Sequence, residues 1–319
     1  MPSVHTITRV CRVDLPYLVF FILHYLEYLC VDGIFLLVLM DVGNQEDIDY
    51  LSNVLTSIKW RDRIHLVQGT QEQIHGMNPD EALKEMMETV LDTFPLFQNA
   101  TFESNDWLLS VDSDEYLYLP GTLMEFLDTI PSRVMQIKFP WICVENTRPW
   151  LSRHPYLDIL ELPWTESIYV KSIVRVHDRV RYKDPHAFLL PRRNITWICR
   201  DGDPMLFHLH SQSLATTLNK ILYHRLPEKS DEEQRQILKE AVSRRDPELF
   251  FSLYKICIIR RDITEGIPYP KVMLCERFHE MLGQYIDVWE FREKEKEMLY
   301  AALDPAAVEW ITAICKDIL

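Results

Sequence analysis

The chain has 319 residues, 47% of them hydrophobic, which is enough to bury a sizeable core and excludes an intrinsically disordered protein. Its 48 acidic residues outnumber its 34 Lys and Arg residues, and the net charge of −14 argues against nucleic acid as a partner because it repels phosphates. Seven scattered cysteines without a C-x-x-C pair indicate reduced thiols, so we expect a cytoplasmic protein.

The first elements in chain order are a strand, an apolar helix and a second strand. Val4–Val10 is rich in β-branched residues and predicts the first strand. Asp14 then precedes an apolar segment, Leu15 to Cys30, that predicts a helix packed against a sheet. Its uncharged part is too short to cross a bilayer, so we expect neither a transmembrane segment nor a signal peptide. The continuous apolar run Ile34–Met40 predicts a parallel strand covered on both faces.

The alternation of helix and strand continues beyond this point. The remaining predicted elements of this part are a helix near Glu46–Ile58, a strand at Ile64–Gln68, a helix at Pro79–Thr93 and strands at Trp107–Val111, Val134–Phe139, Ile168–Val176 and Met205–His210. This order predicts an α/β fold with a doubly wound sheet. After Ser213 the sequence becomes charged and helical, so we expect one domain over residues 1–212 and a helical C-terminal region over residues 213–319.

Three carboxylates, Asp112, Asp114 and Glu115, follow the apolar run Trp107–Val111. Ligands of doubly wound sheets bind beyond the carboxyl ends of the strands, and Asp41 follows the second predicted strand at the same edge. Neighbouring like charges need a counter-charge, and hard carboxylate oxygens suit Mg²⁺ or Mn²⁺. A divalent metal site is therefore our hypothesis, and an exposed acidic turn is the alternative.

Six segments, in this order, resemble elements of the GT-A glycosyltransferases, and among these the family 2-like and family 92-like enzymes. They are "RVDLPYL" (Arg12 to Leu18), "HYLEYLCVDGIFL" (His24 to Leu36), "SVDSDEYL" (Ser110 to Leu117), "VKSIVRV" (Val170 to Val176), "PHAF" (Pro185 to Phe188) and "FHLHSQSL" (Phe207 to Leu214). Val13 stands where the family has Asn, and Asp41 to Asp47 is a loose version of the family's nucleotide loop. No family element is recognisable beyond Lys220.

The resemblance implies a GT-A fold and a Rossmann-like mixed sheet. It implies transfer of a sugar from a nucleoside-diphosphate sugar, which we expect to be a UDP-sugar, to a hydroxyl of a glycan or another acceptor, with inversion and with Mn²⁺ or Mg²⁺ as cofactor. In this family pattern, Asp112 and Asp114 meet the metal and the diphosphate, while Arg12 and Asp41 lie against the nucleoside.

Two histidine positions follow from the same resemblance. His186 of "PHAF" corresponds to a residue near the donor sugar, although an ordinary surface histidine is an equal alternative. The family places a serine five residues after its metal-binding histidine, and Ser213 stands at that spacing from His208 rather than from His210. We therefore take His208 as the third metal ligand, with a hydrogen-bonded strand histidine as the alternative.

The residue pattern itself suggests the remaining roles. Lys171 and Arg175 are four positions apart on a predicted strand and share a face, so both side chains can neutralise a departing diphosphate, or can lie at a sheet edge with no such role. An inverting transfer also needs a carboxylate base to take the proton of the acceptor hydroxyl. Glu145 is the first candidate for this base and Asp184 the second.

Other function classes explain fewer residues. A D-x-D phosphatase needs Thr or Val two residues after the second Asp, where this chain has Tyr116, and needs the motif near its N-terminus. A nucleotidyltransferase needs a glycine-rich basic loop, and the chain has only 8 Gly. A catalytically silent GT-A-like module that binds a glycan or a protein stays open.

Overall fold

The structure is a computed structural model, and it divides into two compact units that we describe separately. The described residues are 2–40, 45–57, 61–97, 106–119, 121–144, 159, 164–176, 180–190, 195–199, 204–209, 214–223, 229–259, 297 and 300–316. The first unit comprises Met1–Ile142 and Ser167–His208, and the second comprises Cys143–Glu166 and Leu209–Leu319. The predicted division at residue 212 stays a prediction, and the structure groups Cys143–Glu166 with the helical part.

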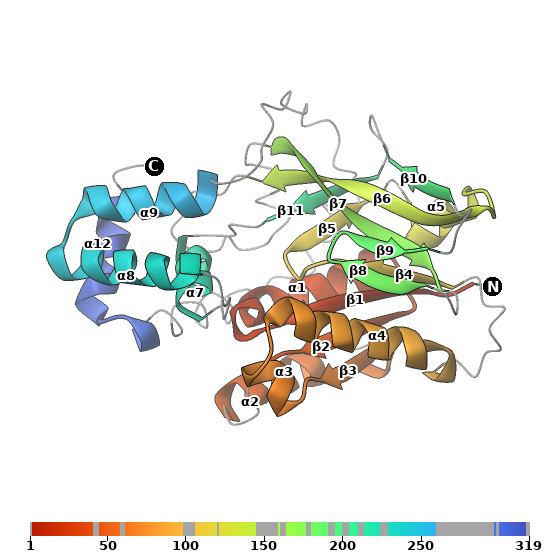
Figure 1. The fold of residues 1–319 in the computed structure, drawn as a ribbon, viewed down its shortest axis with the longest axis horizontal. Helices are drawn as coiled ribbons and strands as arrows, with labels where there is room; N and C mark the ends of the chain where they lie inside the picture. The colour runs from red at the N-terminus through yellow and green to blue at the C-terminus, as the bar shows by residue number, and fades with distance from the viewer. Residues whose placement is uncertain are drawn as a thin grey trace. The chain divides into compact units, whose positions relative to one another are not determined.

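A nine-stranded sheet forms the first unit (Figure 1). Its strands are β1 (Val4–Val10), β2 (Gly33–Val38), β3 (Ile64–Gln68), β4 (Trp107–Ser110), β5 (Glu115–Tyr118), β6 (Val134–Val144), β7 (Trp164–Arg175), β10 (Ile195–Ile198) and β11 (Met205–His208). Their order is β3-β2-β1-β4-β7-β6-β11-β5, with β10 paired to β6. The pairs among β1 to β4 are parallel, whereas β7 runs antiparallel to β4 and β11 antiparallel to β5. The predicted α/β fold with a mixed sheet is confirmed.

The strand order reverses between β1 and β4. The chain proceeds outward from β1 to β2 and β3, and then returns to place β4 on the other side of β1. Such a reversal opens a crevice at the carboxyl ends of the two strands, where doubly wound proteins bind their ligands. Arg9 near the end of β1 and Asp112 just after β4 both lie at this position.

One face of the sheet is covered by a long helix. This helix is α4 (Pro79–Phe97; Figure 1). Its apolar residues Leu83, Met86 and Val90 belong to one buried cluster with Ile7 of β1 and Leu108 of β4. The residues recur at helical spacing, so they share a face. Two shorter helices, α2 (Gln45–Ser57) and α3 (Gln71–His75), also connect strands in this part of the chain. A small hairpin, β8 (Arg181–Asp184) and β9 (Ala187–Leu189), adds Tyr182 and Phe188 to the same cluster.

The apolar segment predicted as one helix from Leu15 to Cys30 is three shorter helical pieces. They are a 3-10 helix (Arg12–Tyr17), α1 (Leu18–Leu23) and a π-helix (His24–Tyr28). The expected burial is confirmed, since Phe21, Ile22 and Tyr25 are each 0% exposed.

The π-helix explains why this buried segment carries polar side-chain tips. His24 Nε2 lies 2.9 Å from the Leu117 carbonyl and therefore donates to it. The Tyr25 and Tyr28 hydroxyls donate to the carbonyls of Glu115 and Leu119 at 3.0 and 2.7 Å. These alternate carbonyls follow one edge of β5, the last strand in the sheet order, and Leu119 is the residue just after that strand. The helical segment therefore satisfies the edge of β5 and holds the strand that carries Glu115.

The described part of the second unit after residue 213 is helical. It comprises α7 (Leu214–Tyr223), α8 (Lys229–Arg244), α9 (Pro247–Ile259) and α12 (Pro305–Lys316). Leu218, Leu238, Phe250, Val308 and Ile311 form its buried cluster. None of the helices that the structure describes is both long enough and apolar enough to cross a membrane.

Candidate active site

The site begins at the reversal of strand order, where two charged side chains lie side by side. Ile7 of β1 pairs with Ser110 of β4 in parallel register, so Arg9 lies level with Asp112. Burial alone would raise the pKa of the Asp112 carboxyl, but Lys171 and Arg9 outweigh it and hold this pKa below its usual range. Asp112 is therefore ionised and faces two cations. Sequence reasoning did not find Arg9, although a lone arginine near the end of an apolar strand was a signal.

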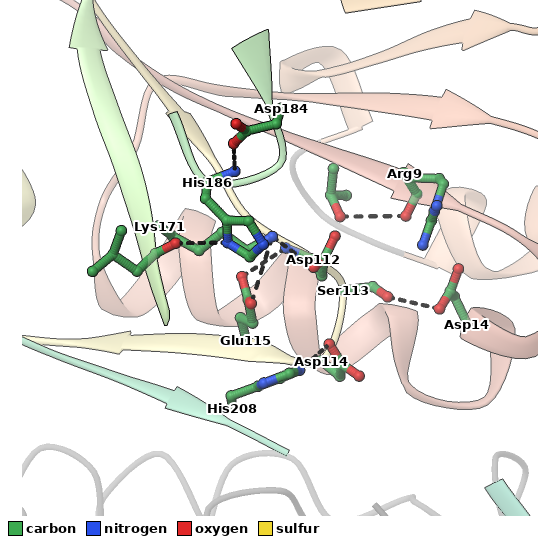
Figure 2. A network of polar contacts seen from close by, with 12 residues as sticks. Arg9, Asp14, Asp112, Ser113, Asp114, Glu115, Lys171, Asp184, His186 and His208 are labelled. Atoms are coloured by element: carbon green, nitrogen blue, oxygen red, sulfur yellow. Dashed lines mark hydrogen bonds and ion pairs between the residues drawn. The ribbon is translucent and has the colours of Figure 1, made fainter. Parts of the chain in front are cut away.

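Lys171 supplies much of the counter-charge that we expected from a metal alone. Its Nζ lies 2.6 Å from Asp112 Oδ2 and 3.6 Å from Glu115 Oε1 (Figure 2). The Lys171 side chain is 1% exposed, whereas that of Asp112 is 34% exposed. Burial alone would lower the pKa of Lys171, but the carboxylates raise it, so the amine is charged. A protein cation therefore neutralises part of the acidic cluster.

Glu115 lies beneath this pair as the first residue of β5. Its side chain is 0% exposed, and burial raises the pKa of its carboxyl well above the usual value despite the charge of Lys171. Its Oε2 accepts a hydrogen bond of 2.8 Å from the backbone N–H of Asp112. Glu115 therefore fixes the turn that carries Asp112 and Asp114, in a position closed to solvent.

Asp114 and His208 are brought together by strands that are distant in sequence. In the antiparallel pair β5 and β11, His208 lies opposite Glu115. This register brings His208 Nε2 to 3.5 Å from Asp114 Oδ1 (Figure 2). Both side chains are nearly buried, with 4% and 7% exposed. Asp114 and His208 thus lie close to each other, and their role as metal ligands stays a prediction; His210 lies outside the described residues.

Asp14 connects the first helical turn to the acidic loop. It does not precede the helix as its cap; instead its Oδ2 accepts from the backbone N–H of Cys11 at 2.6 Å. Its Oδ1 accepts from the Tyr17 hydroxyl at 2.8 Å and from Ser113 Oγ at 2.9 Å. Because Ser113 is the middle residue of the D-x-D triplet, Asp14 holds the loop between the two acidic residues.

The three predicted metal ligands are not assembled into one preformed centre. No three His, Cys, Asp or Glu side chains in the described part of the chain are grouped so as to hold a metal ion. Asp114 and His208 form one pair, while Asp112 is engaged by Lys171. Magnesium-type ions often take one or two protein ligands and complete their shell with water and substrate phosphates. The pair Asp114 and His208 fits that type of site, and an all-protein metal cage does not.

His186 and Asp184 lie on the turn between β8 and β9. His186 Nδ1 lies 2.9 Å from the Val170 carbonyl, so Nδ1 carries the proton and Nε2 is the acceptor (Figure 2). Burial, followed by the charge of Lys171, lowers the pKa of His186, so the ring is neutral. Asp184 Oδ1 accepts from the backbone N–H of His186 at 2.9 Å. Burial by itself would raise the pKa of Asp184. The hydrogen bond from His186 and the nearby Lys183 outweigh burial and hold this pKa below its usual value, which weakens Asp184 as a base.

The remaining predicted site residues lie elsewhere or outside the described residues. Arg175 is not beside Lys171: its Nε donates to the Val134 carbonyl, and its guanidinium lies 4.3 Å from the centre of the Trp107 ring, at the opposite end of β4. The two residues share a face of β7, but four positions along a strand separate them by about 13 Å. Arg12 forms an ion pair with Asp47 at 3.2 Å. Asp41 and Glu145 lie outside the described residues.

Aromatic and imidazole rings border the charged cluster, and sequence reasoning did not find them. The ring centre of Trp141 on β6 lies 4.2 Å from that of His208, 5.3 Å from that of His186 and 5.4 Å from that of Tyr169. Tyr169 stacks on His186 at 5.3 Å with 24° between the ring planes. Lys171 Nζ lies 5.6 Å from the centre of the Trp141 ring. No spacing in the sequence reveals this group, because its members come from separate strands and a turn.

A scan of protein-family models finds none that matches the chain, and a search of curated proteins finds no match either. Solved structures that are similar include the galactosyltransferase LgtC with donor and acceptor sugar analogues, at 10% identity and a TM-score of 0.28 over 54% of this chain and 58% of LgtC. The mannosyltransferase Ktr4p from S. cerevisiae in complex with GDP matches at 9% identity and a TM-score of 0.26, over 44% of this chain and 40% of Ktr4p. Residues 1–349 of TarS from S. aureus match at 12% identity and a TM-score of 0.36, over 94% of this chain and 92% of that one.

The chain therefore spans little more than half of LgtC and less than half of Ktr4p. What the chain shares with doubly wound proteins is visible in its own topology: a mixed α/β sheet whose strand order reverses where its charged residues gather.

Proposed function

We propose that this protein is a glycosyltransferase of the GT-A type, which transfers a sugar from a nucleoside-diphosphate sugar to a hydroxyl acceptor with the help of a divalent cation. The observation that carries this proposal is the meeting of Asp114 and His208 beside the cluster of Asp112, Glu115 and Lys171, at the reversal of strand order. Such a site offers hard ligands and buried cations to a diphosphate at the same edge of the sheet.

Asp114 and His208 would hold the cation, Mn²⁺ or Mg²⁺, which when bound offsets the negative charge that develops on the leaving diphosphate. A carboxylate and a neutral imidazole together bring one negative charge, so phosphate oxygens can join them with less repulsion than at a cluster of carboxylates. Asp14, through Ser113, and Glu115, through the Asp112 N–H, keep the loop in place for this role.

Lys171 and Arg9 would contribute fixed positive charge on the other side of Asp112. Both interact with this carboxylate, so a diphosphate at the loop meets groups that are already held in position and need no reorganisation. For the base that takes the acceptor proton, Glu145 remains the first candidate and Asp184 the second. The UDP donor, the inverting outcome and a glycan acceptor are part of the same proposal.

The experiment that tests the proposal measures UDP binding by calorimetry at saturating Mn²⁺. We expect His208→Ala and Asp114→Asn each to weaken UDP binding at least about tenfold, which is about 1.4 kcal/mol. The matched control is His75→Ala, because His75 is exposed on α3. Wild-type affinity in both site variants would refute the metal and diphosphate site. UDP binding without UDP release from any UDP-sugar would instead favour a binding module without activity.

A further inference from the structure

We propose that Tyr169, His186 and Trp141 form a subsite for a pyranose ring, in which the sugar packs against the exposed part of Tyr169 and donates a hydroxyl hydrogen bond to His186 Nε2. This inference rests on the proposed function and specifies the part of the site that recognises sugar. It assigns a role to rings that the metal and diphosphate chemistry does not use.

The position of Tyr169 carries the first step of the argument. Ser172 of β7 lies opposite Ser110, the last residue of β4, so Lys171 and Tyr169 lie beyond the end of β4, at the edge where Asp112 lies. Residues two apart on a strand share a face, and Tyr169 is therefore one step further out than Lys171 on the same side. Lys171 is buried, whereas Tyr169 is 38% exposed. Its ring thus lies at the border of the charged cluster, within reach of a ligand there.

The chemistry of the group carries the second step. A pyranose ring has faces of C–H groups and a rim of hydroxyls, so it needs an aromatic surface next to a few fixed hydrogen-bonding atoms. Tyr169 supplies the surface, and its stacking on His186 together with the contact to Trp141 holds its ring in place. The hydrogen bond from His186 Nδ1 to the Val170 carbonyl leaves Nε2 as an acceptor for a hydroxyl.

The order of the strands favours a sugar over a nucleobase at this place. The diphosphate site proposed above lies where β1 and β4 meet, and β7 and β6 lie on the other side of β4 from β1 and β2. Arg12, which the resemblance places against the nucleoside, follows β1 and pairs with Asp47 of α2, so the proposed function has the nucleoside on that side. Tyr169 and Trp141 belong to β7 and β6, on the side where the sugar of the donor or of the acceptor would lie.

Three variants and three kinds of ligand test the subsite in solution. The variants are Tyr169→Ala, Tyr169→Phe, which keeps the ring, and Trp197→Ala as the control, and each is compared with the wild type. Trp197 is 39% exposed, which matches Tyr169 at 38%, and it lies on β10 beside Ile137. The ligands are UDP, UDP-glucose, and a panel of methyl glycosides of glucose, galactose, mannose and N-acetylglucosamine, with sorbitol as a polyol without a ring.

With Mn²⁺ present, we expect Tyr169→Ala to bind UDP like the wild type and to lose at least about threefold in affinity for a pyranose ligand, as loss of an aromatic contact implies. Tyr169→Phe and Trp197→Ala should bind that ligand like the wild type. If Tyr169→Ala loses affinity for UDP-glucose but not for UDP, the Tyr169 ring contacts the donor sugar. A loss for a methyl glycoside, measured by saturation-transfer NMR in the presence of UDP, assigns it to the acceptor.

The subsite is refuted if wild-type protein binds UDP while Tyr169→Ala binds every pyranose ligand as well as the wild type does. The subsite is also refuted if the wild type binds UDP but gives no stronger saturation-transfer signal with any pyranose than with sorbitol. A loss of UDP affinity in Tyr169→Ala refutes it as well, because this result would place Tyr169 against the nucleotide. Wild-type protein that fails to bind UDP at all refutes the proposed function instead, so the two failures are distinguishable.

Discussion

Lys171 is the residue whose environment most changes the interpretation of the acidic motif. Three carboxylates at a strand end require positive charge, and a buried ammonium group provides part of it by contacts of 2.6 and 3.6 Å to two of them. Under the proposed function, Asp114 and His208 are the metal ligands among the described residues, so the cation of the protein and the cation of the cofactor would act at different members of one motif.

Removal of the Lys171 charge should destabilise the protein. Lys171→Met leaves the buried Glu115 without its neighbouring cation and the partly exposed Asp112 with Arg9 alone, and breaking a buried ion pair of this kind costs about 3–5 kcal/mol. Glu115 can become neutral by taking up a proton, which reduces the cost of losing the cation. We therefore expect the free energy of unfolding, measured with urea, to fall by about 3 kcal/mol. Lys183→Met is the matched control, because its side chain is 56% exposed and its ion pair with Asp184 is worth less than about 1 kcal/mol. Equal stability of the two variants would contradict the role given to Lys171.

At the scale of elements, the short strand β5 determines where the acidic loop lies. The strand β5 pairs with β11. The carbonyls of Glu115 and Leu117 in β5, and that of Leu119 just after it, accept hydrogen bonds from the π-helix. Buried backbone carbonyls need such partners, and His24, Tyr25 and Tyr28 provide them. The apolar N-terminal segment is therefore both a core element and the support of the site.

Tyr25→Phe tests this support with the loss of a single hydroxyl. The Glu115 carbonyl loses its donor while the packing of the ring is kept, so we expect the free energy of unfolding to fall by about 1–3 kcal/mol. Tyr300→Phe is the control, since Tyr300 is 43% exposed and surface changes of this kind stay within about 0.5 kcal/mol. Thermal or urea unfolding measures both variants. A loss in Tyr300→Phe as large as that in Tyr25→Phe would show that the hydroxyl of Tyr25 has no special role.

At the scale of the whole molecule, the site depends on strands that run in both directions. The parallel strands β1 and β4 bring Arg9 and Asp112 to the point where the strand order reverses. The strand β7, which runs antiparallel to β4, and the strand β11, which runs antiparallel to β5, then return Lys171 and His208 to the same edge. The charges of one site thus come from four separate parts of the chain.

Metal and nucleotide should consequently bind together. Two protein ligands hold a divalent ion weakly, so we expect Mn²⁺ to bind the free protein poorly and at least about tenfold more tightly when UDP supplies further oxygens. Linkage requires Mn²⁺ to raise the affinity for UDP by the same factor. Calorimetric titrations of each ligand, with and without the other and with EDTA as the reference, measure both factors. UDP affinity that EDTA leaves unchanged would contradict the metal-assisted site.

Local patterns in the sequence were enough to predict several of the elements and the location of the charged edge. The apolar runs of β1, β2, β3 and β4 and the helical spacing of α4 predicted these elements to within a few residues, because each pattern depends on neighbours along the chain. The carboxylates directly follow the strand Trp107–Val111 in the sequence, so local order also predicted that they lie at the ligand-binding edge of the sheet. The spacing to Ser213 selected His208, which the structure places beside Asp114.

The tertiary structure alone decided which charges meet. The two-residue period of a strand correctly indicated that Lys171 and Arg175 share a face of β7. It carries no information about distance along the strand, so the pattern assigned one shared role to two residues that lie beside opposite ends of β4. Arg9, Asp14 and the rings of Trp141, Tyr169 and His186 acquire their places through strand order, register and one tight turn. These contacts join residues far apart in the chain, and a pattern within one segment cannot specify its partner in another.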